Sequence, residues 1–149
     1  MSLENLRVIG RLQAHAPDRG SVQKLLTAAR RNLADAQVQS ISKDNRFDAA
    51  YKAIQQCAMI GLWVSGYRTS TSQPGHHQTA LQCLTLTMGL PPPSVIVLDA
   101  LRKQRNLSDY EGDPISDGAL ASCLEEASKL LVITERWLGT EHPMLAGDP

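Results

Sequence analysis

Apolar residues recur at three- and four-residue steps along most of the chain, which is the spacing of one face of an α-helix. In the stretch SVQKLLTAARRNLADAQVQ, for example, Leu25, Leu26, Ala29 and Leu33 share one face and the charged residues fall elsewhere. Ser21, after a glycine, is a suitable N-cap for this helix. The same pattern predicts five helices, over residues 21–39, 45–67, 76–90, 94–110 and 116–138.

The predicted helix 45–67 differs from the others because its later half is apolar on nearly all sides. A helix of this kind is usually central and covered by neighbours on two sides. Gly61 and Gly66 each cost about 1 kcal/mol of helix propensity relative to alanine. We expect Gly61 to permit a close contact with another helix and Gly66 to mark the helix end.

Loop and turn signals separate these helices. The segment YRTSTSQPG at 67–75 predicts a polar loop, and EGDPI at 111–115 predicts a turn before Ser116, which caps the last helix. Three prolines at 91–93 end one helix and open the next. The run Val95–Val97 has no second β-rich run to pair with, so we predict helix there.

Together these elements predict one all-α domain over residues 1–149. The expected architecture is an antiparallel up-and-down bundle of four to five main helices with short connections. Its core covers about residues 21–138, with a short helix within residues 1–12 and frayed ends.

Composition narrows the function classes. Fifteen basic residues balance fifteen acidic ones, so no overall field attracts nucleic acid or an acidic membrane. There is no apolar run of the roughly 20 residues that span a bilayer, and the amino terminus lacks a signal-peptide pattern. Three separated cysteines in apolar stretches predict free thiols and a reduced, cytoplasmic protein without a disulfide framework or zinc site. We expect no membrane contact and no cofactor.

The chemistry concentrates in the segment LRKQRNLSDY, residues 101–110. Arg102, Asn106 and Tyr110 follow one another at four-residue steps, and Arg105 continues the core-facing ridge beside them. The interpretation that assigns a site here brings Arg105, Asn106 and Tyr110 to one patch. Arg102, Arg105 and Asn106 would bind a phosphate, because a guanidinium can hold it with two hydrogen bonds. Tyr110 would donate to a phosphate oxygen or stack on a base.

A simpler interpretation makes the same residues a solvated helix end. Arg105 then pairs with Asp109 one turn away and Tyr110 is half-buried. Spacing alone favours this interpretation, since basic residues also suit the carboxyl end of a helix. The adjacent His76 and His77 do not predict a metal site, because neighbouring helical side chains point about 100° apart.

The order of these segments resembles the HEPN superfamily (higher eukaryotes and prokaryotes nucleotide-binding domains). The resemblance covers residues 21–138 and runs through RFDAAYKAIQQCAMIGL, GYRTSTSQPGHHQTALQCL and LDALRKQRNLSDYEG. Its most specific parts are Arg105-Asn106 followed by a tyrosine, and Gly75-His76-His77 at a helix start. It implies a dimeric helical bundle, and many members are metal-independent ribonucleases of toxin–antitoxin, phage-defence or CRISPR systems.

The family motif places a histidine four to six positions after the arginine, where this chain has Tyr110. A phenol with a pKa of about 10 is a poor general base near neutral pH. If the chain is catalytic, the resemblance assigns the chemistry to Arg105, Asn106 and Tyr110, and His76 or His77 could supply an imidazole.

Two hypotheses follow. The first is a HEPN-type homodimer that engages RNA or a nucleotide, with weak or degenerate ribonuclease activity, as part of a toxin–antitoxin or defence pair with an antitoxin or nucleotidyltransferase partner. The alternative is a non-catalytic interaction or dimerisation module in which the Arg-Asn-Tyr motif is structural. No residue set supports a third possibility, an enzyme with a small substrate inside the bundle.

Overall fold

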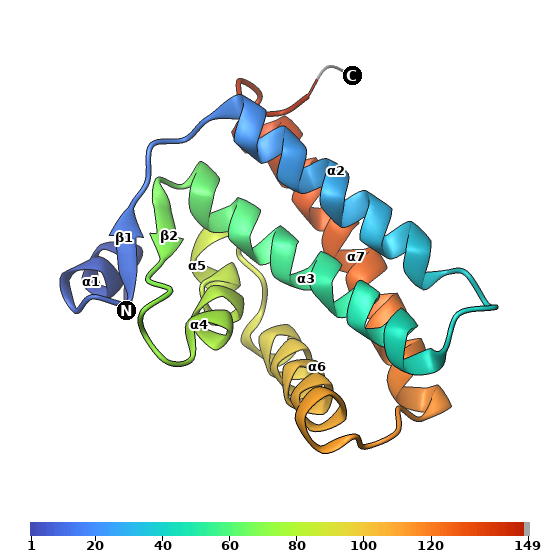
Figure 1. The fold of residues 1–149 in the computed structure, drawn as a ribbon. Helices are drawn as coiled ribbons and strands as arrows, with labels where there is room; N and C mark the ends of the chain where they lie inside the picture. Colours follow the sequence, from blue (N-terminus) through green and yellow to red (C-terminus); the bar gives the residue numbers. More distant parts are fainter. Residues whose placement is uncertain (148–149) are drawn as a thin grey trace.

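Four long helices build most of the structure, a computed structural model that describes residues 1–147 (Figure 1). The predicted all-α helical bundle is confirmed. In chain order the elements are α1 (Leu3–Val8), β1 (Leu12–Ala14), α2 (Arg19–Ala36), α3 (Lys43–Val64), β2 (Tyr67–Thr69), α4 (His76–Gln82), α5 (Leu84–Thr87), α6 (Pro92–Glu111) and α7 (Asp117–Glu141).

Helix α3 is the centre of the bundle, as its apolar surface predicts. It contacts α2 and α7 along one side and α4, α5 and α6 along the other (Figure 1). Phe47, Ile54, Ile60 and Leu62 on α3 are almost completely removed from solvent. Burying a side chain of this size stabilises the fold by about 1.5–3 kcal/mol, so α3 dominates the core.

Gly61 permits the close contact expected of it. A Cβ atom at this position would lie 2.8 Å from Oγ1 of Thr87 and 3.2 Å from Cε of Met88, where α5 ends. The short α5 therefore packs against α3 at a separation that only glycine allows.

The predicted bounds of the first two long helices are shifted. Helix α2 begins two residues before Ser21, and its N-cap is Asp18, whose carboxylate accepts from the Ser21 backbone N–H at 2.8 Å. A carboxylate also suits the positive end of the helix. Helix α3 is capped by Ser42 and ends at Val64, because Gly66 adopts a left-handed φ of 94°.

The single helix predicted for residues 76–90 is wrong, because the chain divides at Cys83 into α4 and α5. The turn tightens there, with the Leu86 N–H donating to the Cys83 carbonyl at 2.9 Å. The hydroxyl of Thr87 also donates to that carbonyl. Serine and threonine hydroxyls that bond backbone carbonyls compete with regular helix, and the stretch is rich in threonine.

The helix starts near the prolines and Ser116 agree with the sequence. Helix α6 begins at Pro92, and Val95–Val97 lies inside it as helix. The Ser116 hydroxyl accepts from the Ala119 N–H at 3.1 Å and caps α7. The proline and the serine cap fix these two helix starts through local interactions alone, so the sequence predicts them without knowledge of the packing.

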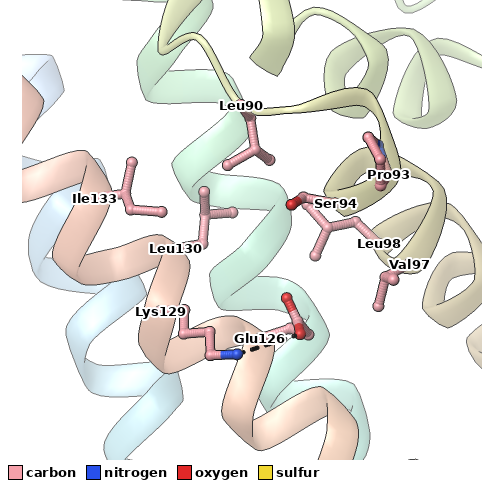
Figure 2. A pocket seen from close by; sticks show the side chains of 9 residues that line it. All are labelled: Leu90, Pro93, Ser94, Val97, Leu98, Glu126, Lys129, Leu130 and Ile133. Carbon is pink, nitrogen blue, oxygen red and sulfur yellow. Dashed lines mark ion pairs between the residues drawn. The ribbon is translucent and has the colours of Figure 1, made fainter.

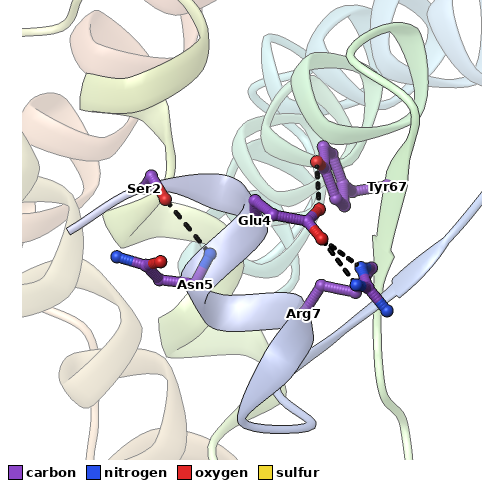
Figure 3. Close-up of polar contacts among 5 residues, drawn as sticks. All are labelled: Ser2, Glu4, Asn5, Arg7 and Tyr67. Carbon is purple, nitrogen blue, oxygen red and sulfur yellow. Dashed lines mark hydrogen bonds and ion pairs between the residues drawn. The ribbon is translucent and has the colours of Figure 1, made fainter.

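A small antiparallel sheet joins the amino terminus to the end of α3. Leu12 pairs with Thr69, and Ala14 pairs with Tyr67. The prediction of a loop through 67–75 is wrong for its first three residues, and the helix expected within residues 1–12 ends at Val8. Figure 3 shows the polar contacts that hold α1 here, including the Tyr67 hydroxyl donating to Glu4 at 2.9 Å.

Both ends of the described chain, where the sequence predicts fraying, make contacts with the bundle. Leu6 and Leu12 are buried near the amino terminus. Helix α7 continues to Glu141, and the Gln23 side-chain amide donates to the Leu145 carbonyl at 2.9 Å. The last two residues, 148–149, lie outside the described part of the chain.

The three cysteines carry buried, free thiols, as predicted. Burial raises the pKa of Cys57 and Cys123 to about 12 and that of Cys83 to about 11. These thiols therefore remain protonated and behave as small apolar groups. No helix in residues 1–147 combines the length and the apolar character required to cross a membrane.

We expect Gly61→Ala to lower the free energy of unfolding by about 1–3 kcal/mol, because the added methyl overlaps Thr87. Gly139→Ala is the matched control, since nothing lies within 4 Å of its Cβ in α7. Alanine at position 139 should raise the free energy of unfolding by as much as about 1 kcal/mol, because alanine has the higher helix propensity. Denaturant unfolding of both variants checks this, and equal effects would contradict the close packing of α5 on α3.

Candidate functional site around Arg105

Arg105 turns inward from α6 and binds two carboxylates of its own bundle. Its Nε lies 2.9 Å from Asp109 Oδ2 and 3.3 Å from Asp48 Oδ1, and 27% of its side chain is exposed. The pair with Asp109, one turn along α6, is the one that the spacing favours. Asp48 belongs to α3, 57 residues earlier, and no local pattern indicates it.

The ring of Tyr51 lies under this ion-pair network. The Arg105 Cζ atom is 5.6 Å from its centroid, a cation–π distance. The Tyr51 hydroxyl donates to Gln55 Oε1 at 3.1 Å, and both side chains are buried. Burial raises the pKa of Tyr51 to about 12, although the charges of Arg105 and Arg102 oppose the change. Tyr51 is therefore neutral near pH 7 and cannot act as a base.

The other two cations of the segment are also paired. Arg102 Nε lies 2.8 Å from Asp99 Oδ1, and Lys103 Nζ lies 3.5 Å from Asp99 Oδ2. With the two partners of Arg105, three carboxylates balance three cations within this part of the structure. Both arginines pair through Nε, so carboxylates of the bundle already compensate the positive charge that the phosphate interpretation requires.

The structure does not bring Arg105, Asn106 and Tyr110 to one patch. Tyr110 is 80% exposed, so the prediction that it is half-buried is wrong as well. A step of five residues places Tyr110 far round the helix from Arg105, which faces α3. Asn106 is half-buried between these two directions.

His77 lies closer to the arginines than the sequence could indicate, because α4 packs beside α6. Burial lowers the pKa of His77, and the positive charges of His76, Arg105 and Arg102 lower it further. The two histidine rings are 4.3 Å apart between centroids and tilted by 41°. No group of three or more His, Cys, Asp or Glu side chains in residues 1–147 is arranged to hold a metal ion.

An open pocket of about 270 Å³ lies between α6 and α7, and no sequence pattern indicates it (Figure 2). Its walls are mostly apolar and include Pro93, Val97, Leu130 and Ile133, with Lys129 at one end. It contains none of the predicted site residues and no nucleophile activated by a neighbour. Such a mostly apolar surface can contact another molecule.

No protein-family model matches the chain, and no curated protein sequence matches it significantly.

We expect the His77 imidazole to titrate below the usual histidine value in an NMR pH titration, with its signals assigned through His77→Gln. Arg102→Gln should raise this pKa, because removing a neighbouring positive charge makes protonation easier. Arg136→Gln, an exposed cation on α7, should leave it unchanged. If the His77 titration midpoint is the same in Arg102→Gln as in the natural sequence, Arg102 on α6 does not lie close enough to His77 on α4 to affect its charge.

Proposed function

We propose that the chain is a HEPN-like helical interaction module in which Arg105 has a structural role. The observation that supports this most directly is that Arg105 binds Asp48 and Asp109 within its own bundle. An arginine held this way links α6 to α3, and its charge is compensated before any ligand arrives.

The neighbouring residues support the same proposal. The position of the motif histidine is occupied by Tyr110, which extends into solvent away from Arg105. Tyr51, the phenol in contact with Arg105, has a raised pKa and stays protonated. Neither group is suited to accept a proton from a ribose hydroxyl near neutral pH.

The HEPN resemblance gives the proposal its biological setting. A module of this kind would act in the cytoplasm as a homodimer, or with an antitoxin or nucleotidyltransferase partner in a toxin–antitoxin or defence system. The exposed apolar residues of α6 and the pocket between α6 and α7 are compatible with protein contacts.

We expect Arg105→Ala to lower the free energy of unfolding by about 1–2 kcal/mol, because it leaves two carboxylates without their shared partner. Arg105→Lys should restore part of the loss. Arg136→Ala is the control for removing an exposed cation. Urea unfolding measures all three, and an Arg105→Ala protein as stable as the control would refute a structural role.

A second candidate function, RNA or nucleotide binding, is favoured by three basic side chains, His77, Arg102 and Arg105, because the positive charges of both arginines help to lower the pKa of His77. A ligand phosphate would exchange with Asp99 or Asp48 and bind the released guanidinium. This candidate assigns catalysis to Arg105, Asn106 and Tyr110, as the resemblance does.

If this candidate is correct, the protein cleaves or binds mixed RNAs in the presence of EDTA. Arg105→Ala and Arg102→Ala should each weaken binding about tenfold, the cost of a lost charge-assisted hydrogen bond. Tyr110→Phe tests the phenol, and Arg136→Ala should bind like the natural sequence. Gel-shift and cleavage assays at fixed salt measure the two activities. Failure to detect either RNA binding or RNA cleavage would count against this candidate.

A further inference from the structure

The pocket between α6 and α7 exists because both helices pack against α3 more extensively than against each other. It has a volume of about 270 Å³. Leu98 and Leu130, each only 2% exposed, line it together with Leu90, Val97 and Ile133. Most of its wall is therefore apolar, as in pockets that bind small molecules through a few polar groups.

One carboxylate in this pocket has no close partner. Glu126 of α7 lines the pocket, and only 23% of its side chain is exposed. Within residues 1–147 its one polar partner is the Lys129 ammonium, which is 4.0 Å away and beyond hydrogen-bond distance. Lys129 lies nearer to Glu125, at 3.0 Å. A carboxylate that is largely removed from water is stabilised by a cation that donates a hydrogen bond to it.

The second polar group of the pocket is a hydroxyl from the opposite wall. Ser94 belongs to the first turn of α6 and is half-buried. Figure 2 shows its side chain and that of Glu126 extending from the two helices into the space between them. A hydroxyl oxygen can accept a hydrogen bond. An ammonium group in the pocket therefore meets two acceptors, one from each helix.

The same pocket is poorly suited to an anion. Helix α6 begins here with two prolines, which have no N–H group, and the N–H groups of Ser94 and Val95 donate to the Pro91 carbonyl at 2.9 and 3.3 Å. This helix end therefore lacks the free N–H groups that bind phosphate or carboxylate. Among the described residues that line the pocket, Lys129 is the one cation, and Glu125 already pairs with it.

We propose that this pocket binds a small organic amine, in which a protonated amino group is attached to an apolar body. The ammonium group donates to the Glu126 carboxylate and the Ser94 hydroxyl. The apolar body lies against Val97, Leu130 and Ile133. Charge complementarity thus selects an amine over an alcohol or a carboxylate of the same shape.

This site is separate from the ion pairs of Arg105. None of the residues that line the pocket takes part in those pairs. The inference therefore goes beyond the proposed function, and it does not depend on the role of Arg105. Amine binding and the unfolding of Arg105→Ala are independent measurements.

The apolar surface continues past the pocket along α7. Val132, exposed at 53%, lies with Ser128, Lys129 and Ile133 around a shallow apolar hollow. Because Lys129 and Ile133 also line the pocket, the two surfaces adjoin. An apolar body too long for the pocket can extend over Val132. Affinity should therefore increase by up to about fourfold for each methylene group that is buried.

Lys129 competes with the amine for the Glu126 carboxylate. Its side chain is 60% exposed, and its ammonium lies between Glu125 and Glu126. An amine that reaches Glu126 replaces the more distant partner and leaves the nearer pair intact. Removing the Lys129 charge should therefore strengthen amine binding, which is the opposite of what a general loss of structure would do.

Titration of the full chain with hexylamine, followed by NMR, tests the proposal. Like a lysine side chain, with a pKa of about 10.4, this probe is a cation at pH 7. The amide signals of residues 94–98 and 126–133 should shift. Hexanol and hexanoate should bind at least about tenfold more weakly, because neither can donate a charge-assisted hydrogen bond to Glu126. Equal binding of the three probes, or no shift in these two segments, overturns the proposal.

Three substitutions on α7 locate the ammonium group. Glu126→Gln keeps the side-chain shape but removes the charge, and it should weaken hexylamine binding about tenfold. Lys129→Gln should strengthen binding about twofold to fivefold. Glu135→Gln is the matched control and should bind like the natural sequence, because Glu135 pairs with Arg30 of α2 at 3.3 Å and lies outside the pocket.

The two test variants can each contradict the proposal. Hexylamine binding that is as tight in Glu126→Gln as in the control overturns it. So does unchanged or weaker binding in Lys129→Gln, and this variant decides the question if Glu126→Gln does not fold.

Discussion

The constraint on which this fold depends is that α3 must be covered on every side. Its later half offers no polar face to solvent, so α2 and α7 cover one side and α4, α5 and α6 cover the other. Gly61 lets α5 approach closely enough to complete this cover. Leaving even one large α3 side chain exposed would forfeit about 1.5–3 kcal/mol, a substantial part of the 5–15 kcal/mol by which domains are stable.

The first half of α3 carries polar side chains, and these side chains set the charge environment of Arg105 on α6. Asp48, Tyr51 and Gln55 recur at helical spacing and form one ridge of α3. Arg105 meets this ridge through an ion pair and a ring contact. The interaction that attaches α6 to the bundle is therefore the one that neutralises the arginine. Attachment and phosphate recognition draw on the same guanidinium, whose charge is already compensated by carboxylates of the bundle.

The sequence predicts what is encoded within a few residues. Helical periodicity, the Ser116 cap, the proline start of α6 and the Arg105–Asp109 spacing are all local, and the structure confirms them. It does not predict contacts that packing creates between distant segments. Asp48 is 57 positions from Arg105, His77 reaches the arginines only because α4 packs beside α6, and the strands of the small sheet are three residues each. The pocket between α6 and α7 likewise cannot be predicted from local patterns, because it forms only where the two helices pack together.

The ion pairs of Arg105 also have a consequence for the orientation of α6. A helix that is apolar on two opposite faces can bury either one, and hydrophobic burial alone discriminates weakly between them. Removing an ion-paired group from solvent contributes little net stability, but the pair between Arg105 and Asp48 of α3 forms only when Val95 and Leu98 face inward. If α6 rotated by half a turn, Arg105 would lose Asp48, and that partly exposed carboxylate would lose its ion-pair partner. The polar network therefore fixes the helix rotation and leaves Ile96 and Leu107 on the outside.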